Sequence, residues 1–212
     1  SDGSNAEIPV TWDDSSVNYK QDGSYTVTGK VGYPEYDNPF IESKADPWIT
    51  KGDDGYYYFT ASYPMNGGGD SNGYSRVTLR RAKTIKGLQT AEEVSIWNWS
   101  AAEGVYRYIW APEIHQINGR WYVFFTGSVE KNNPFGIRPH ILVCKEGGNP
   151  MDPASWSVQR MEASNGDALS FTNFSLDMTH FEAGGQHYVI WAQSVGNSSL
   201  LIATIDRMNR GS

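Results

Sequence analysis

The sequence of 212 residues predicts an all-β fold, and two observations lead to this prediction. Aromatic residues make up 14% of the chain, and aromatic side chains favour sheets and provide flat faces for packing or for ligands. A pattern of strand, turn and strand also occurs three times, with 67 and then 64 residues between the acidic residues that head the copies. Repeats of short antiparallel strands that cover one another's faces are typical of a β-propeller.

Each copy of the repeat is predicted to form a β-hairpin. An acidic residue is followed by a short strand, a glycine-bearing turn and an aromatic-rich strand. The copies cover residues 45–60, 111–126 and 176–191, with turns at Asp53-Asp54-Gly55, Asn118-Gly119 and Gly184-Gly185. Such turn residues reach the positive φ angles that tight hairpins require. We therefore expect three hairpins, headed by Asp46, Glu113 and Asp177.

Further strand-like runs extend these hairpins into four-stranded units. Residues 76–82 and 93–97 follow the first hairpin, 140–145 and 155–159 follow the second, and 200–205 follow the third. The chain thus supplies roughly the first three blades of a propeller, which closes with about four to eight. Because an open blade exposes an unpaired edge and an apolar face, we expect a complementary C-terminal chain or segment to cover it.

The N-terminal part differs from the repeat. Residues 1–38 are rich in Ser, Gly and Asp and are predicted to form a tail with an extra hairpin that includes the alternating run 25–28. Residues 39–212 form the blades. Within them, the glycine-rich residues 64–73 are predicted to be a surface loop, with a place at the substrate rim as an equal alternative.

Composition excludes several classes of partner. The net charge is −7 and the 17 Lys and Arg residues are scattered, which argues against nucleic acid. No apolar run approaches the ~20 residues that span a membrane.

Cys144 is the only cysteine and is expected to be a buried, unreactive thiol. The first residues lack the basic and apolar segments of a secretion signal, which is expected to have been removed or never to have existed.

The candidate site follows from the repeat. In a propeller the innermost strands line one axis, so Asp46, Glu113 and Asp177 are expected to converge, and paired carboxylates are what glycoside hydrolysis requires. The alternative is that each acid only accepts hydrogen bonds at the start of its strand. Aromatic residues beside the heads can stack on a sugar or pack in the core; they are Trp48, Trp110, Phe174 and Trp191. His115 and His180 match no metal-site spacing, so no catalytic metal is expected.

Five linked motifs resemble glycoside hydrolase family 43, most closely its α-L-arabinofuranosidase and exo-arabinanase members. The likeness extends from about residue 38 to about 206, in the order and spacing of the family. The motifs are Asn38–Ile49 with its Ala-Asp-Pro-Trp string, Tyr56–Ser62, Arg80–Leu88, Trp110–His115, and Phe174–Phe181 with the later Trp191–Gln193.

The resemblance implies an inverting hydrolase on a five-bladed propeller with three acids. Asp46 matches the general base that activates water, and Asp177 matches the residue that tunes and positions the general acid. That acid is a glutamate of the fourth blade, in a string that this sequence does not contain. Glu113 matches a residue that lines the site, and Trp48, Trp110, Phe174 and Trp191 are assigned with it to substrate binding.

The resemblance also sets expectations for substrate, cofactor and location. The product would be L-arabinofuranose, released from arabinan or from arabinoxylan side chains and oligosaccharides of the plant cell wall. No cofactor is needed for the chemistry, although relatives carry a structural calcium or sodium ion in the axial channel. A secreted or periplasmic location would suit such a substrate.

Three other functions stay open on the sequence alone. A β-xylosidase cannot be separated from an arabinofuranosidase, because rim loops set the specificity. A fructan-active enzyme shares an early Asp-Pro string, but its Arg-Asp-Pro and Glu-Cys signatures are absent. A non-catalytic carbohydrate-binding propeller fragment would account for the incomplete acid set. For the same reason, residues 1–212 alone are expected to be inactive and to associate through the open blade.

Overall fold

The computed structural model describes residues 10–32, 36–64, 73–164 and 166–205. The chain divides into two compact units, Ser1–Phe40 and Ile41–Ser212. In the described residues all regular structure is β, apart from three short 3₁₀ helices, η1 (Lys86–Gln89), η2 (Ala101–Glu103) and η3 (Pro153–Ser155). The predicted all-β class is therefore confirmed.

The first unit contains one antiparallel hairpin. Strand β1 (Val10–Asp13) pairs with β2 (Thr28–Val31), with Val10 opposite Val31. The alternating run 25–28 of the sequence precedes β2 and shares only Thr28 with it. Every residue of both strands is exposed, so no described residue of this unit forms a layer over either face of the ribbon.

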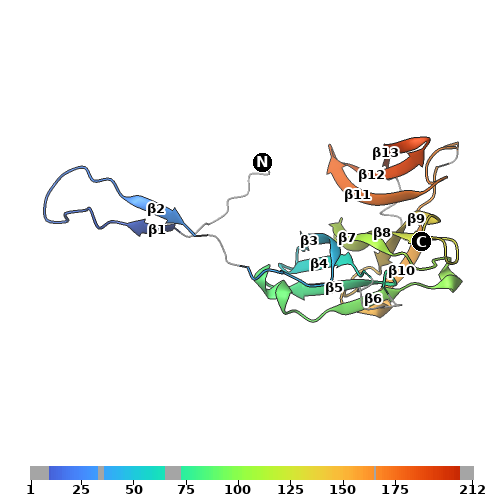
Figure 1. Ribbon diagram of the computed structural model, residues 1–212, viewed down its shortest axis with the longest axis horizontal. Helices are drawn as coiled ribbons and strands as arrows, with labels where there is room; N and C mark the ends of the chain where they lie inside the picture. Colours follow the sequence, from blue (N-terminus) through green and yellow to red (C-terminus); the bar gives the residue numbers. More distant parts are fainter. Residues whose placement is uncertain (1–9, 33–35, 65–72, 165, 206–212) are drawn as a thin grey trace. The chain divides into compact units, whose positions relative to one another are not determined.

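The second unit consists of three antiparallel sheets, each a meander of strands that are consecutive in the chain (Figure 1). The first sheet contains β3 (Ala45–Lys51), β4 (Tyr57–Ser62), β5 (Arg76–Ala82) and β6 (Val94–Asn98). The second contains β7 (Trp110–Ile117), β8 (Arg120–Ser128), β9 (Ile137–Cys144) and β10 (Trp156–Arg160). The third contains β11 (Ser175–Ala183), β12 (Gln186–Val195) and β13 (Asn197–Thr204). The strands expected for each copy of the repeat are present, with bounds that differ by a few residues.

The second sheet lies between the other two and is buried on both faces. Alternate side chains of β8 point to opposite faces. Trp121 and Phe125 belong to the core shared with the first sheet, whereas Tyr122 and Phe124 belong to the core shared with the third. This arrangement explains why β8 is apolar along most of its length. Cys144, at the end of β9, is buried in the first of these cores, as the sequence predicted.

The third sheet is covered on one face only. Val189 and Trp191 of β12 point into the core shared with the second sheet and are 2% and 1% exposed. On β13, Leu200 and Ile202 are 74% and 59% exposed. Large apolar side chains on an outer strand at this exposure form an uncovered face.

Candidate active site

A β-bulge interrupts the beginning of the first strand of each sheet in the second unit. The regular pairing skips two residues between Ala45 and Trp48 in β3, between Trp110 and Glu113 in β7, and between Leu176 and Thr179 in β11. The first skipped residue has a positive φ in every case: 51° at Asp46, 44° at Ala111 and 52° at Asp177. For residues other than glycine this conformation costs on the order of 1 kcal/mol or more. The same strained bulge conformation therefore recurs near the start of β3, β7 and β11.

The bulges correct the equivalence expected from the sequence. Glu113 was aligned with the two aspartates, but the residue that occupies their position in the second sheet is Ala111. Glu113 instead corresponds to Trp48 and Thr179, the first residues paired again after the bulge. The error came from taking the acidic residue of each copy as its head, since the acid of the second copy lies two residues after Ala111.

The three strand heads form one pocket of about 250 Å³. It is lined by Asp46, Pro47, Trp48, Ala111, Glu113 and Asp177. This volume lies just below the ~300–1,000 Å³ of typical small-molecule sites, so the described walls suit a single small sugar unit. Asp46 and Asp177 are accessible to solvent, and the side chain of Glu113 is 20% exposed. The three acids singled out from the sequence therefore lie together, although they are about 65 residues apart in the chain.

Asp46 is held by a buried hydroxyl. The Oγ of Ser62, at the end of β4, donates to Asp46 Oδ2 over 2.6 Å. The same Oγ accepts the backbone N–H of Ala111 over 2.8 Å. One oxygen of the Asp46 carboxylate is thus fixed, and no described residue is hydrogen-bonded to Oδ1, which is left for a ligand or water.

Glu113 is held on one oxygen by two neighbours. Thr179 Oγ1, from the third sheet, donates to Glu113 Oε2 over 2.7 Å. The Nε2 of His115, two residues further along β7, lies 3.1 Å from the same oxygen. Within the described part of the chain Oε1 of Glu113 accepts no hydrogen bond and is left for a ligand. Ser62 and Thr179 lie within two of the linked motifs, but no role was assigned to them, because a hydroxyl residue in a strand does not show by itself which carboxylate it contacts.

Asp177 has a different electrostatic environment. Partial burial, and then the negative charges of Asp46 and Glu113, raise the pKa of the Asp177 carboxyl above its usual value. Among the described residues none donates a hydrogen bond to this carboxylate. Desolvation and like-charge repulsion both disfavour the ionised form, which is the environment expected where several carboxylates share one site.

The four aromatic candidates divide between the pocket and the packing around it. Trp48 lines the pocket, and its indole N–H donates to the carbonyl of Ile114 over 2.9 Å. Trp110 packs edge-on against Tyr74 and Tyr108. Neither Trp110 nor the other two candidates are among the pocket-lining residues.

Phe174 and Trp191 make aromatic contacts outside the pocket. The rings of Phe174 and Phe135 have centroids 6.0 Å apart, and Phe135 is 74% exposed. Trp191 is 1% exposed and packs on Phe171 with ring centroids 4.7 Å apart. Trp191 therefore belongs to the core, because the odd-numbered residues of this part of β12 face the second sheet.

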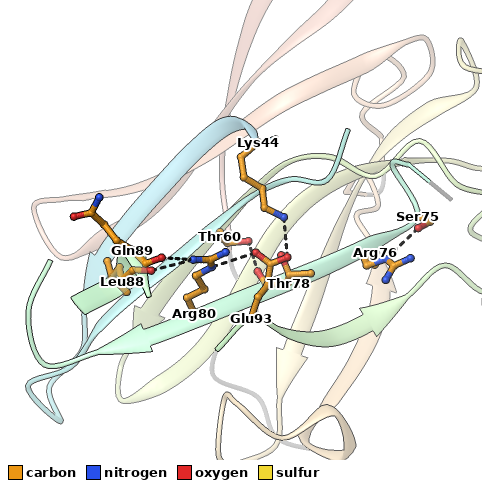
Figure 2. Close-up of polar contacts among 9 residues, drawn as sticks. All are labelled: Lys44, Thr60, Ser75, Arg76, Thr78, Arg80, Leu88, Gln89 and Glu93. Carbon is orange, nitrogen blue, oxygen red and sulfur yellow. Dashed lines mark hydrogen bonds and ion pairs between the residues drawn. The ribbon is translucent and has the colours of Figure 1, made fainter. Parts of the chain in front are cut away.

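Ion pairs anchor the segment that enters β3 just before Asp46. Glu93 accepts from Lys44 Nζ at 2.8 Å and from Arg80 Nε at 3.3 Å (Figure 2). Arg80 also donates to the carbonyls of Leu88 and Gln89. The Lys44 side chain is only 7% exposed, and a charge-assisted pair at that depth holds the strand entry more firmly than a surface pair would.

Histidines lie behind the pocket rather than in it. His115 and His180 have ring centroids 5.4 Å apart, and His180 Nε2 lies 3.2 Å from His187 Nδ1. Burial lowers the pKa of His180 to about 4, so this ring is neutral near pH 7. No group of three or more His, Cys, Asp or Glu residues in the described part of the chain is arranged to hold a metal ion.

The fold and the site together define the class of protein. Successive antiparallel sheets bring three carboxylates to a small, partly open pocket, and such a group of acids is characteristic of glycoside hydrolases. The model of the glycosyl hydrolases family 43 matches residues 36–210. The chain belongs to this family.

Individual relatives carry arabinofuranosidase names. The chain is 41% identical over 175 residues to alpha-L-arabinofuranosidase 43 of Humicola insolens, covering 80% of this chain and 33% of the relative. It is 40% identical over 174 residues to the extracellular exo-alpha-(1->5)-L-arabinofuranosidase of Streptomyces avermitilis, covering 79% and 32%. The crystal structure of an alpha-L-arabinofuranosidase from Lactobacillus brevis superposes with a TM-score of 0.67 at 37% identity, covering 82% of this chain and 52% of that chain. The chain thus spans about a third of the length of the curated relatives that it matches.

The N-terminal residues match a different family. A model of the bacterial Ig-like domain (group 4) matches residues 1–33, which include the hairpin β1–β2. In the described part of the chain no helix has the length and apolar character needed to cross a membrane.

Proposed function

We propose that the protein containing this chain is an inverting α-L-arabinofuranosidase that releases L-arabinofuranose from arabinan or from arabinoxylan side chains. The observation that supports this most is the pocket itself, in which Asp46, Glu113 and Asp177 come together from three sheets. Relatives about 40% identical that are named arabinofuranosidases point to arabinose rather than to another sugar. Plant cell-wall polysaccharide and its oligosaccharides are the proposed substrates. The extracellular names of the Streptomyces relatives favour a secreted or periplasmic location.

Asp46 is the proposed general base. Its Oδ2 is occupied by Ser62, so Oδ1 accepts a proton from the water that attacks the anomeric carbon. The leaving oxygen takes its proton from a carboxylic acid that is not among residues 1–212. Attack by water from the face opposite the leaving group inverts the anomeric centre.

Asp177 is proposed to act on that acid through its charge. A negative group beside a carboxylic acid raises the pKa of the acid and keeps it protonated near neutral pH. Trp48 and Glu113 are proposed to hold the sugar: Trp48 as a pocket wall, and Glu113 through the Oε1 left available by Thr179 and His115.

The architecture proposed for the whole enzyme is a five-bladed propeller, of which the three sheets here are the first blades. The exposed Leu200 and Ile202 support this proposal, since a fourth blade would cover them as the second sheet covers the first. That covering segment, or a complementary chain, would also bring the general acid. Without it, residues 1–212 are expected to bind weakly and not to turn over.

The decisive experiment uses the full-length protein with a synthetic aryl α-L-arabinofuranoside. Release of arabinose, with the β-anomer as the first product detected by NMR, is the expected result. The matched aryl β-xyloside and a fructan serve as competing substrates. Faster hydrolysis of either would overturn the arabinose assignment, and saturable binding of arabinose without turnover would show a binding module instead.

A further inference from the structure

The hydroxyl of Ser62 occupies a position that determines the direction of its hydrogen bonds. Ser62 is the last residue of β4, lies opposite Ala45 in the sheet and is fully buried. Its Oγ accepts from the N–H of Ala111, a group that can only donate. The single hydroxyl proton is therefore directed to Asp46 Oδ2, and the distance of 2.6 Å is that of a charge-assisted O–H···O⁻ bond.

The partner of Ser62 on the opposite side belongs to the next sheet. The bulge between Trp110 and Glu113 removes Ala111 from the β7–β8 pairing, so its N–H has no partner in the ladder and Ser62 supplies one. One buried hydroxyl therefore connects Asp46 of the first sheet with Ala111, the equivalent residue of the second. Both residues line the pocket.

We propose that Ser62 is a positioning residue for the reaction. Its Oγ is also bonded to the N–H of Ala111 in the second sheet, so it holds the Asp46 carboxylate in one orientation, with Oδ1 facing the attacking water. This rests on the proposed role of Asp46 as the base. Without the hydroxyl, the carboxylate of Asp46 rotates between several orientations, and the aligned one is populated for only part of the time. An error of about 1 Å in such a group can lower the rate ~10²-fold.

Thr60 provides a matched control on the same strand and the same face. It is fully buried like Ser62, but its Oγ1 donates to the carbonyl of Thr78 over 2.8 Å within the first sheet and does not contact a pocket carboxylate (Figure 2). Ser62→Ala and Thr60→Val each remove one buried hydroxyl. Ser62→Ala also leaves the N–H of Ala111 without this acceptor, so it should lower the melting temperature at least as much as Thr60→Val, and only Ser62→Ala should affect Asp46.

The test measures kcat and KM of the full-length enzyme on the aryl α-L-arabinofuranoside. We expect Ser62→Ala to lower kcat by about 10- to 100-fold with KM within about twofold, and Thr60→Val to keep kcat within about twofold. Ser62→Thr, which keeps a hydroxyl, should recover most of the loss if it retains the wild-type melting temperature. A kcat within twofold of wild type in Ser62→Ala, or an equal loss in Thr60→Val, would overturn the proposal.

A second arm separates this inference from the function on which it rests. Ser62→Ala is combined with Asp46→Asn, and hydrolysis of a substrate with a strongly activated leaving group is followed. If Ser62 acts through Asp46, its removal adds less than about twofold on the Asp46→Asn background. If Ser62→Ala lowers kcat as much on the Asp46→Asn background as it does in the wild type, Ser62 has a structural role instead. Full activity of Asp46→Asn, in contrast, contradicts the proposed function.

Discussion

Asp46 and Asp177 occupy the same place in the first and third sheets, in the same bulge and with nearly the same φ, yet their surroundings differ. Asp46 accepts a short hydrogen bond from a buried hydroxyl. Asp177 receives none from the described residues, and burial and two neighbouring carboxylates raise its pKa. The repeat thus sets where a carboxylate lies, and the residues around it determine which proton chemistry it can perform.

The second sheet extends this comparison. Ala111 has the same bulge and the same positive φ but no acidic side chain. Its methyl group lines the pocket, where a fourth carboxylate would fill space and add repulsion, and its N–H donates to Ser62 of the Asp46 network instead. The strained backbone is therefore common to all three sheets, whereas the chemistry differs at each of them.

The largest effect is expected from Asp46→Asn in the full-length enzyme. The amide cannot accept the proton of water, so kcat should fall by about 10²–10⁴-fold, the usual contribution of a general base. Sugar affinity should change little, because Ser62 can still donate to the amide oxygen. Steady-state kinetics and titration with arabinose check both parts. More than about a tenth of the wild-type kcat would remove Asp46 from the base role.

A second prediction concerns the pH dependence of Asp177→Asn. Loss of the negative charge beside the general acid lowers the pKa of that acid, so the acid deprotonates at lower pH. The alkaline limb of the kcat profile should therefore move to lower pH. Profiles of the wild type and the variant in the same buffers decide this. An alkaline limb that coincides with that of the wild type would show that Asp177 is structural.

Much of this arrangement could be predicted from the sequence, because turns and alternation are local signals. The hairpin turns at Asn118-Gly119 and Gly184-Gly185 and the strand Arg76–Ala82 are found where expected. The convergence of Asp46 and Asp177 followed from the repeat. It needed only the assumption that successive sheets share an axis.

The bulges could not be predicted in the same way, because positive φ at Asp46, Ala111 and Asp177 has no signal in residue type. Tertiary packing imposes it. Alignment on Pro47 and Pro112 would have given the correct equivalence, since both prolines follow the strained residue. The sequence left sugar stacking and core packing open for Trp191, because which face of a strand is buried depends on the neighbour that covers it.

The smallest expected effect is on stability, and it tests whether the two aspartates differ as their surroundings indicate. Because the pKa of Asp177 is raised in the folded protein, the folded state binds this proton more tightly than the unfolded chain. The free energy of unfolding therefore falls as the pH rises from the pKa of 3.8 in the unfolded chain through the raised pKa in the folded protein. This loss of stability is present at pH 7. Asp177→Asn removes the cost, so its melting temperature should exceed that of the wild type at pH 7, by ~2–4 °C for each kcal/mol regained.

At pH 3, where Asp177 is protonated in both states, that difference should vanish. Asp46→Asn provides the matched control at the equivalent position: it replaces a charge-assisted hydrogen bond with a neutral one, so its melting temperature at pH 7 should equal or fall below that of the wild type. Scanning calorimetry of the three proteins at both pH values gives the comparison. If both variants change the melting temperature at pH 7 by the same amount, the prediction is wrong. The shared backbone position would then determine the energetics of both carboxylates, and the hydroxyl beside Asp46 and the charges beside Asp177 would have no separate effect.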